Sequence, residues 1–309
     1  MRILLVTNGY PPAARGGVET YTQSLAQTLQ ARGHTVEVFC RVSDPRRPEY
    51  AVLVEAVSGI PVRRVVNDLT GAPDFEDHYR DPRPAALFRR HVAEFRPDVV
   101  HVQHTLGLSA AILPAAQALG RPLLATLHDF WYFCPRATLF DAERRLCPGP
   151  GGEVDCVRCL GGVQLGPLSP LQRLPAYKWL LARLPARLNR GLRARLDRPN
   201  ARAPAPPADR GRHRAQMLAR TRQLLEWLSL ADRLLAPSAF VKELYVAQGL
   251  PAERLAVLPL GVERGPARPR RAGPFTVAFI GSLQYHKGPD LLVEAWRQAP
   301  EWPAHLRLF

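Results

Sequence analysis

The chain has 309 residues, 46% of them hydrophobic, so it can bury a sizeable core and is long enough for two domains of ordinary size. Its formal net charge is +15, from 42 Lys and Arg residues against 27 Asp and Glu residues. Residues 173–222 hold 14 of the basic residues and only two acidic ones, so the rest of the chain is nearly neutral. A charge confined to one segment argues against a nucleic-acid coat protein.

The N-terminus carries no recognisable export signal. The apolar run over residues 3–6 is too short, and no small-residue cleavage site follows it. The most apolar long window, 108–127, contains Gln, Arg, Gly and two Pro residues, which is typical of a helix, a turn and a strand rather than of a membrane span. We therefore expect a cytoplasmic protein whose cysteines are reduced.

Apolar runs and helical patterns alternate through residues 1–258. This β-α-β alternation predicts an α/β fold with a doubly wound, Rossmann-like domain around a parallel sheet. The expected strands cover 2–7, 36–40, 62–66, 98–103, 122–127, 233–236 and 254–258. The expected helices cover 17–31, 84–95, 108–119 and a segment capped by Ser238.

A second domain begins after a linker. Residues 259–274 are rich in Pro, Gly and Arg, which is typical of a linker. Residues 275–309 then start a new unit, with a strand over 275–281, a helix over 289–298 and a strand over 304–309. Two strands and one helix cannot close a core by themselves, so we expect this second domain to be incomplete in the chain.

Residues 129–165 form a Pro- and Gly-rich insertion with four cysteines: Cys134, Cys147, Cys156 and Cys159. Four thiols in so short a loop, with one Cys-x-x-Cys pair, are typical of a structural zinc site, and the metal would supply folding energy that the loop lacks. An iron–sulfur cluster, a disulfide or unlinked buried cysteines are the alternatives. The cytoplasmic context disfavours the disulfide.

A second insertion, 171–230, carries most of the basic block. Residues 171–196 place Leu, Trp and Tyr at helical spacing with Arg between them, which predicts an amphipathic basic helix. Such a helix could bind an anionic membrane surface, where each basic residue contributes on the order of 1 kcal/mol, or it could be a solvated face covering the domain. The Pro-rich stretch 198–207 predicts a mobile loop. Aromatic residues are too sparse here for a nucleic-acid partner.

The first candidate site follows the first strand. Gly16 and Gly17 open the first helix, and Glu19 lies in its first turn. Glycines at a helix start let a phosphate or carboxylate approach the exposed N–H groups and the positive end of the helix dipole. An ordinary helix-start turn explains the pair equally well. The dinucleotide fingerprint Gly-x-Gly-x-x-Gly is missing at this position, which argues against an NAD dehydrogenase.

Two histidines follow neighbouring strands. His104 comes after the strand over 98–103, and His128 comes after the strand over 122–127. In an open parallel sheet the carboxyl ends of the strands face the ligand crevice. One histidine alone is more often structural, but two at adjacent strand ends, on the same edge as the glycine pair, favour a functional site.

The second domain repeats the arrangement. Gly281 and Ser282 follow its first strand, and Lys287 precedes its helix. Lys287 could reach a phosphate from the opposite side of a cleft, although an exposed lysine at a helix start is usually only solvated. The sequence contains no Asp-x-Asp pattern to clamp a metal-bound diphosphate, and no pair of carboxylates typical of a glycoside hydrolase stands out.

Taken together, these segments resemble the retaining family-4 glycosyltransferases of GT-B fold, nucleotide-sugar-dependent enzymes in which two Rossmann-like domains face a cleft. The matching segments keep the family's order and cover most of the chain: 16–19, 99–104, 126–129, 231–238, 258–263 and 281–288. The resemblance implies a GT-B chain with one complete Rossmann-like domain and the beginning of a second, truncated one.

The resemblance also implies residue roles. Gly16 and Gly17 would border the donor diphosphate, His128 would lie beside the reacting sugar, and Lys287 would neutralise the departing diphosphate. The expected donor-binding set is completed by Glu19, His104, Gly281 and Ser282. Transfer builds positive charge on the sugar ring and negative charge on the leaving group, so hydrogen-bond donors aimed at that phosphate are the largest expected catalytic term.

The implied reaction is transfer of a hexosyl group from a nucleotide-diphosphate sugar to a saccharide or lipid-linked acceptor, with retention and without a catalytic cofactor. Two features depart from the family. Ser282 stands where many members have Arg, and the downstream Glu-x7-Glu segment that holds the sugar and ribose is absent. We therefore expect little or no activity from this chain alone. The alternatives are a related GT-B sugar-nucleotide epimerase and a non-catalytic module that binds a membrane or a partner.

Overall fold

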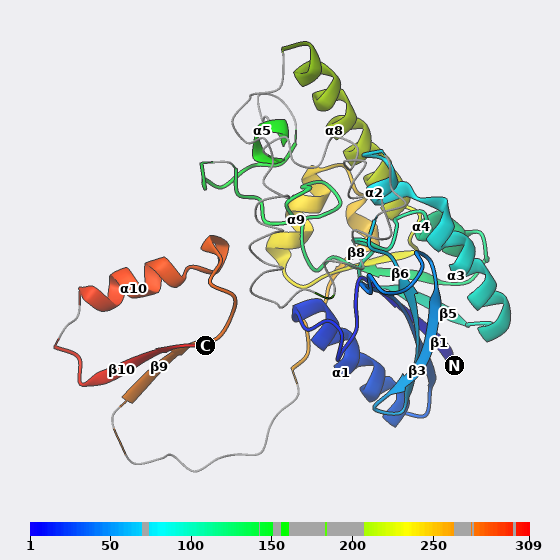
Figure 1. The fold of residues 1–309 in the computed structure, drawn as a ribbon, viewed down its shortest axis with the longest axis horizontal. Coiled ribbons are helices and arrows are strands. Elements are labelled where there is room, and N and C mark those ends of the chain that lie inside the picture. Colours follow the sequence, from blue (N-terminus) through cyan, green and yellow to red (C-terminus); the bar gives the residue numbers. More distant parts are fainter. Residues whose placement is uncertain are drawn as a thin grey trace. The chain divides into compact units, whose positions relative to one another are not determined.

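The computed structural model describes residues 1–69, 74–141, 143–150, 156–160, 183, 207–262, 273, 275–298 and 301–309. They form two compact units (Figure 1). The first consists of Met1–Leu139 and Pro148–Val262, and the second of Phe140–Cys147 and Glu263–Phe309. Each unit is described by itself below.

The first unit is built on an eight-stranded sheet with the order β3-β4-β2-β1-β5-β6-β7-β8. Its strands are β1 (Arg2–Thr7), β2 (Thr35–Val42), β3 (Val52–Val57), β4 (Ile60–Val66), β5 (Val99–Val102), β6 (Leu123–Thr126), β7 (Arg233–Ala236) and β8 (Leu255–Val257). Every strand pair is parallel except β3 with β4, so the predicted doubly wound parallel sheet is confirmed. The sequence analysis missed β3 because this edge strand is mostly exposed and has no buried apolar run.

Helices connect the parallel strands. They are α1 (Gly17–Ala31), α2 (Asp77–Arg80), α3 (Pro82–Phe95), α4 (Ile112–Gln117), α5 (Cys156–Leu160), α8 (Pro207–Leu228), α9 (Ala239–Ala247) and the 3₁₀ turn η1 (Ala252–Arg254). Ser238 caps α9 as predicted, because its hydroxyl accepts a hydrogen bond from the backbone N–H of Val241. Asp81 caps α3 in the same way through Arg83.

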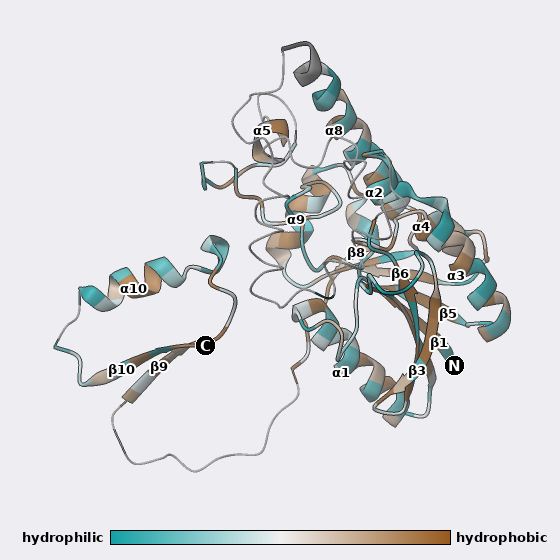
Figure 2. Cartoon of the chain, viewed as in Figure 1, coloured by the Kyte–Doolittle hydropathy of each residue, from teal (hydrophilic) through white to brown (hydrophobic). Residues whose placement is uncertain are grey.

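Each face of the sheet has its own core. On one face, α1 packs against β1 and β2 in a small apolar cluster that includes Leu5, Ala26 and Val38. On the other face, a larger cluster joins the strands to α3, α4, α8 and α9. Figure 2 shows the strands as largely hydrophobic and the outer helix surfaces as hydrophilic. Alternate residues of a strand point to opposite faces, so neighbouring residues at a strand end serve different cores.

The strand order places a topological switch point between β1 and β5. From β1 the chain runs to β2 and β4 on one side, and it returns to β5 on the other side of β1. The loops after β1 and β5 therefore lead to opposite faces of the sheet, the arrangement at which open α/β sheets bind their ligands. A ligand site in the first unit is expected at this point.

The insertion over 129–165 was predicted as a loop, but its first residues are buried in the core. The segment after β6 contains Trp131, Tyr132 and Phe133, each at most 3% exposed, and it forms part of the larger core. These aromatic residues bury too much apolar area to lie in a loop without a core. The amphipathic helix predicted over 171–196 and the mobile loop predicted over 198–207 lie outside the described residues, apart from residues 183 and 207.

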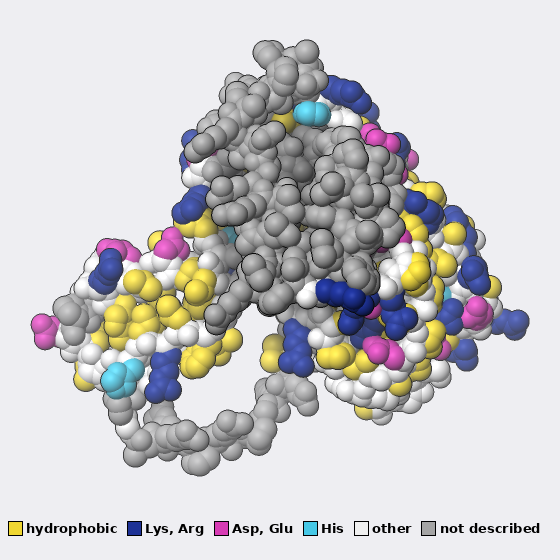
Figure 3. Space-filling model, in the orientation of Figure 1, with side chains coloured by type: hydrophobic (Ala, Val, Ile, Leu, Met, Phe, Trp, Pro, Cys, Tyr) yellow, Lys and Arg dark blue, Asp and Glu magenta, His cyan; other side chains and the backbone are white. Residues whose placement is uncertain are grey.

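The second unit pairs β9 (Phe275–Phe279) with β10 (Ala304–Leu308) in parallel, with η2 (Tyr285–Lys287) and α10 (Pro289–Arg297) between them. These elements agree with the predicted β-α-β start. No residue of α10 is buried, and large apolar side chains such as Ile280, Leu291 and Trp302 are exposed. Hydrophobic side chains gather on the visible face of this unit (Figure 3).

Among the described helices of both units, none combines the length and the apolar character that crossing a membrane requires.

Candidate functional site

The loop between β1 and α1 is built around Glu19. Its carboxylate is buried and accepts a hydrogen bond of 2.8 Å from the Asn8 side chain through Oε1. A Cβ atom on Gly16 would lie 2.5 Å from Glu19 Oε2, and one on Gly9 would lie 2.7 Å from Ala14 Cβ. A side chain at Gly16 would therefore force the carboxylate of Glu19 to shift. This explanation differs from the ligand approach that the sequence predicted for both glycines.

Gly17 is surrounded by open space. Among the described residues, no atom beyond the adjacent backbone lies within 4 Å of the position that a Cβ would take. Gly16 precedes it as the N-cap and has no side chain to cap the backbone N–H groups of the first turn of α1. These N–H groups and the helix dipole can bind an anion, and a missing side chain at Gly17 keeps the approach open. Of the two glycines, Gly17 is the one whose surroundings suit a phosphate contact.

An arginine from β4, two strands away from β1, fixes the same loop. Arg64 of β4 is 3% exposed and donates hydrogen bonds to the carbonyl oxygens of Tyr10 (2.9 Å) and Pro11 (2.7 Å). It also forms an ion pair with Glu55 on β3. The sequence analysis missed Arg64, although an arginine inside an apolar strand is a signal for a buried polar contact.

The ends of β5 and β6 are joined by two hydrogen-bonded pairs. His128 Nε2 lies 2.8 Å from Gln103 Oε1, and His104 Nε2 lies 3.1 Å from both carboxylate oxygens of Asp129. Residues 103 and 104 are adjacent, as are 128 and 129, so the two pairs lie on opposite faces of the sheet. The structure thus brings His104 and His128 to neighbouring strand ends, where the sequence analysis expected them, and separates their surroundings.

His128 lies on the α1 side. Its ring packs edge-on against Tyr21 of α1, with 5.3 Å between the ring centroids. Burial, with a smaller contribution from the nearby His104 and against the opposing effect of Asp129, lowers the pKa of His128 to about 4. The imidazole is therefore neutral at neutral pH. Tyr21 comes one helical turn after Gly17, so this neutral ring belongs to the same corner of the unit as the open start of α1.

His104 lies on the other side and is 2% exposed. Its Nδ1 accepts a hydrogen bond of 3.0 Å from the backbone N–H of Leu106, and its Nε2 donates to Asp129. Both ring nitrogens are thus used within the fold. We therefore do not assign the predicted donor contact to His104, whose geometry suits the orientation of Asp129.

Asp129 is held by several groups. The backbone N–H of Trp131 donates to its carboxylate, and the Tyr245 hydroxyl of α9 donates to its carbonyl oxygen at 2.7 Å. Burial raises the pKa of this carboxyl, but His104 and the Trp131 N–H outweigh that effect and bring the pKa below its usual range. The resulting anion fixes the segment that follows β6.

A further pair lies one step back along the same strands. His101 Nε2 and Thr126 Oγ1 are 2.8 Å apart, and both side chains are buried. Burial lowers the pKa of His101 to about 4, with a smaller contribution from His128. Together with the pair of Gln103 and His128, it forms a polar ladder on the α1 side that leads to the strand ends.

The predicted donor residues of the second unit are all exposed. Gly281 and Ser282 follow β9, and Lys287 closes η2. Gly288 adopts a left-handed conformation (φ 72°) that starts α10, which explains the glycine at this position. Their contacts with a donor remain predictions.

The four cysteines of the predicted zinc site all lie among the described residues. Within the described parts of the chain, no group of three or more His, Cys, Asp or Glu side chains could hold a metal ion. Cys134 and Cys156 pack against the core of the first unit, whereas Cys147 belongs to the second unit and Cys159 ends the short helix with Leu160. The aromatic residues 130–133 are part of the core of the first unit, and zinc binding by the cysteines stays a prediction.

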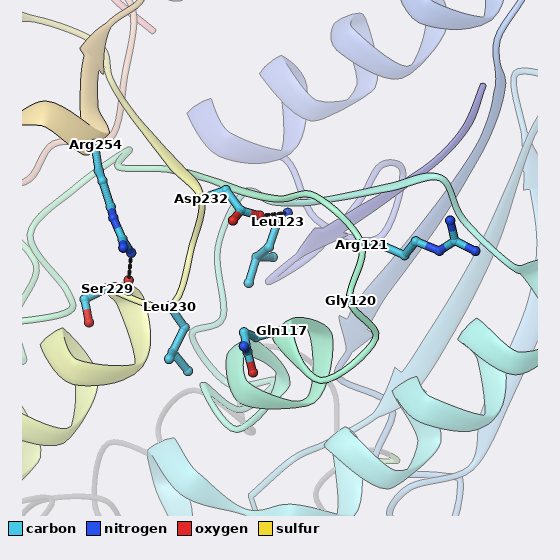
Figure 4. Close-up of a pocket in the computed structure, with 8 residues that line it drawn as sticks. All are labelled: Gln117, Gly120, Arg121, Leu123, Ser229, Leu230, Asp232 and Arg254. Carbon is cyan, nitrogen blue, oxygen red and sulfur yellow. Dashed lines mark hydrogen bonds between the residues drawn. The ribbon is translucent and has the colours of Figure 1, made fainter.

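A separate pocket of about 460 Å³ lies at the opposite edge of the sheet (Figure 4). It is lined by Gln117, Gly120, Arg121, Leu123, Ser229, Leu230, Asp232 and Arg254. Asp232 accepts from the backbone N–H of Leu123, and Arg254 donates to the carbonyl of Ser229. Its polar groups thus bond to the backbone at the amino ends of the strands, away from the switch point, and we do not assign a ligand to it.

Comparison with known proteins identifies the family of the chain. Residues 15–199, more than half of the chain, match the model of Glycosyltransferase Family 4. The chain belongs to glycosyltransferase family 4. The match to the family begins just before the open start of α1 and includes both hydrogen-bonded pairs. A search of curated proteins found no match.

Solved structures of the GT-B type share the fold of this family-4 chain. The catalytic domain of starch synthase IV from Arabidopsis thaliana is 13% identical, with a TM-score of 0.53, and the match covers 99% of this chain and 68% of that one. Sucrose-phosphate synthase from Thermosynechococcus elongatus is 17% identical, with a TM-score of 0.51, and the match covers 99% and 61%. The chain thus spans about three fifths of the length of the latter protein.

Proposed function

We propose that this family-4 chain takes part in transfer of a hexosyl group from a nucleotide-diphosphate sugar to a saccharide or lipid-linked acceptor, with retention of configuration. The observation that carries the proposal is the switch-point cluster. The open start of α1 at Gly17 and the neutral ring of His128 lie at the carboxyl edge of one parallel sheet. The starch synthase relative, whose structure contains ADP, supports a nucleoside diphosphate as part of the donor.

Each part of the cluster has a role in this reaction. The uncapped N–H groups of α1 stabilise the negative charge of the diphosphate, and Gly17 permits close approach. His128 lies beside the reacting sugar and is neutral, so it adds no positive charge next to a sugar ring that becomes positive in the transition state. Lys287, with Gly281 and Ser282, would neutralise the leaving diphosphate.

The acceptor side of the proposal concerns the membrane. The basic block over 173–222 suits an anionic lipid surface, where lipid-linked acceptors are found. Of its described residues, Arg212, Arg214 and Arg222 are exposed on α8. We therefore propose a cytoplasmic protein that binds the inner face of the membrane peripherally. Salt-sensitive binding to vesicles of phosphatidylglycerol, compared with neutral vesicles, tests this part.

The experiment for the main proposal is a donor screen with the full chain. Release of nucleoside diphosphate is measured for UDP-, GDP- and ADP-hexoses in the presence of saccharide and lipid-linked acceptors. We expect slow release with one donor class, in line with the low activity expected of this chain, and a further fall of at least about tenfold in His128→Ala, because a preorganised group at the reacting centre is lost. His34→Ala is the matched control, since this histidine lies far from the strand ends at the start of β2. Equal rates for both variants would refute the assignment.

A further inference from the structure

Gln103 is a buried amide whose two ends are unequally satisfied. The side chain is 0% exposed, and its Oε1 lies 2.8 Å from His128 Nε2. Its Nε2 has no hydrogen-bond partner among the described residues. An unpaired buried N–H group costs on the order of 1–3 kcal/mol, so packing alone would favour methionine, which has a similar shape. The carbonyl end of Gln103 must therefore supply something that an apolar side chain cannot.

That contribution is the tautomer of His128. A carbonyl oxygen only accepts hydrogen bonds, so Nε2 of the facing imidazole carries the hydrogen. In a neutral imidazole the other nitrogen is then an acceptor. No described residue forms a hydrogen bond with Nδ1 of His128, whereas both nitrogens of His104 are used within the fold. The two histidines at the strand ends thus differ in what they offer to a ligand.

The ring of His128 is also held in place. Tyr21 packs against it at an angle of 64°, and Gln103 fixes its Nε2 edge. The neighbouring pair of His101 and Thr126 continues the polar ladder beneath it. A ring fixed at its edge and face has its remaining nitrogen at a defined position, which is what recognition of one hydroxyl group requires.

We propose that Gln103 is a positioning residue that holds His128 as the Nε2–H tautomer, so that Nδ1 accepts a hydrogen bond from a hydroxyl group of the donor sugar. This inference rests on the proposed transferase function. A neutral acceptor binds the hydroxyl without opposing the positive charge that develops on the sugar ring, whereas the Nδ1–H tautomer would present a donor to it.

The first test measures the tautomer directly in the full chain without substrate. Long-range ¹H–¹⁵N correlation spectra distinguish Nε2–H from Nδ1–H imidazoles, and the His128 signals are assigned by their loss in His128→Asn. We expect Nε2–H in the unmodified chain and a rise of the Nδ1–H form in Gln103→Met. Thr126→Val, which removes the neighbouring hydrogen bond to His101, is the matched control and should leave the tautomer of His128 unchanged. An Nδ1–H imidazole in the unmodified chain, or an unchanged one in Gln103→Met, overturns the proposal.

Gln103→Glu provides a second test if Gln103→Met does not fold, as judged by circular dichroism. The carboxylate still accepts from Nε2–H and also stabilises the imidazolium, so the pKa of His128 should rise by at least one unit. The other titratable groups facing the ring are Tyr21 from α1, His101 and His104 from the β5 segment, and Asp129, and all remain in place. A pKa that does not rise contradicts the contact.

Kinetics separates this inference from the proposed function. With UDP-glucose or the donor class that the screen identifies, Gln103→Met should lower kcat about tenfold with little change in KM, and Gln103→Glu should move the acid limb of the pH profile upward. Unchanged kinetics together with the expected tautomer shift overturns the role toward the sugar. The expected tautomer shift with no transfer in any variant refutes the proposed function and leaves only the contact between the two side chains.

Discussion

Two adjacent glycines at the start of α1 should respond in opposite ways to the same substitution. In Gly17→Ala the new methyl group enters open space, since nothing lies within 4 Å of it. In Gly16→Ala the methyl group would lie 2.5 Å from Glu19 Oε2, so the carboxylate must move. Neither glycine has a left-handed conformation, so alanine is compatible with the backbone at both positions.

The magnitudes follow from these contacts. Gly17→Ala reduces the freedom of the unfolded chain and should stabilise the first unit by about 0.4–1 kcal/mol. Gly16→Ala is stabilised by the same reduction in the freedom of the unfolded chain, but it disturbs the 2.8 Å hydrogen bond from Asn8 to Glu19. A hydrogen bond to a charged group contributes about 1.5–3 kcal/mol. The net effect is a loss of about 1–2 kcal/mol. For a unit of this size, 1 kcal/mol shifts Tm by about 2–4 °C.

Thermal unfolding and calorimetric titration with nucleoside diphosphates measure both effects. Gly17→Ala should melt higher but bind the diphosphate at least about tenfold more weakly, which corresponds to about 1.4 kcal/mol. Gly16→Ala should melt lower, and in a Glu19→Ala background its cost should disappear, because the clash is gone. If Gly17→Ala binds as tightly as the unmodified chain, the phosphate does not approach α1 at Gly17. If Gly16→Ala costs as much without Glu19, the steric explanation is wrong.

The other predictions concern stability. Arg64→Met should lower the free energy of unfolding by about 3 kcal/mol, because two buried carbonyl oxygens lose their donor. Urea unfolding measures this loss, and a loss below about 1 kcal/mol would show that Arg64 does not hold the loop between β1 and α1. In the folded state the pKa is lowered to about 4 for three histidines: His91, His101 and His128. As the pH falls below 6.5, these histidines are therefore protonated in the unfolded chain before they are protonated in the folded one. The free energy of unfolding should fall between pH 6.5 and 4, by up to about 3 kcal/mol per histidine, and a flat profile in urea titrations would exclude this linkage. Tyr245→Phe should cost about 1 kcal/mol in the same assay, because the carbonyl of Asp129 loses its donor; no change would show that the contact is dispensable.

Elements set by local pattern could be predicted from the sequence. The helix after the first strand was expected over 17–31 and is found at Gly17–Ala31, because apolar spacing and the closing glycine both lie within one segment. The strand over 233–236 and the Ser238 cap were predicted for the same reason. The edge strand β3 was missed because its residues are exposed on a hairpin and lack the apolar run of a central strand.

Contacts between segments could not be predicted in this way. Gln103 was passed over although it precedes His104, because its partner lies 25 residues away and is adjacent only through the pairing of β5 with β6. The role of Gly16 depends on where the carboxylate of Glu19 folds back, which spacing does not show. The cysteine spacing did not show that the aromatic residues between β6 and Cys134 are drawn into the core, because that depends on packing against distant segments.

The alternation of side chains explains why two similar histidines receive different roles. Each of the dipeptides Gln103-His104 and His128-Asp129 ends a parallel strand, and its two side chains point to opposite faces of the sheet. On the face of α3 and α9, His104 and Asp129 pair with each other beneath the aromatic core. On the face of α1, where the chain enters the switch point, the same geometry leaves one nitrogen of His128 without a protein partner among the described residues. The order of residues within each pair therefore decides which histidine supports the fold and which one can meet a ligand.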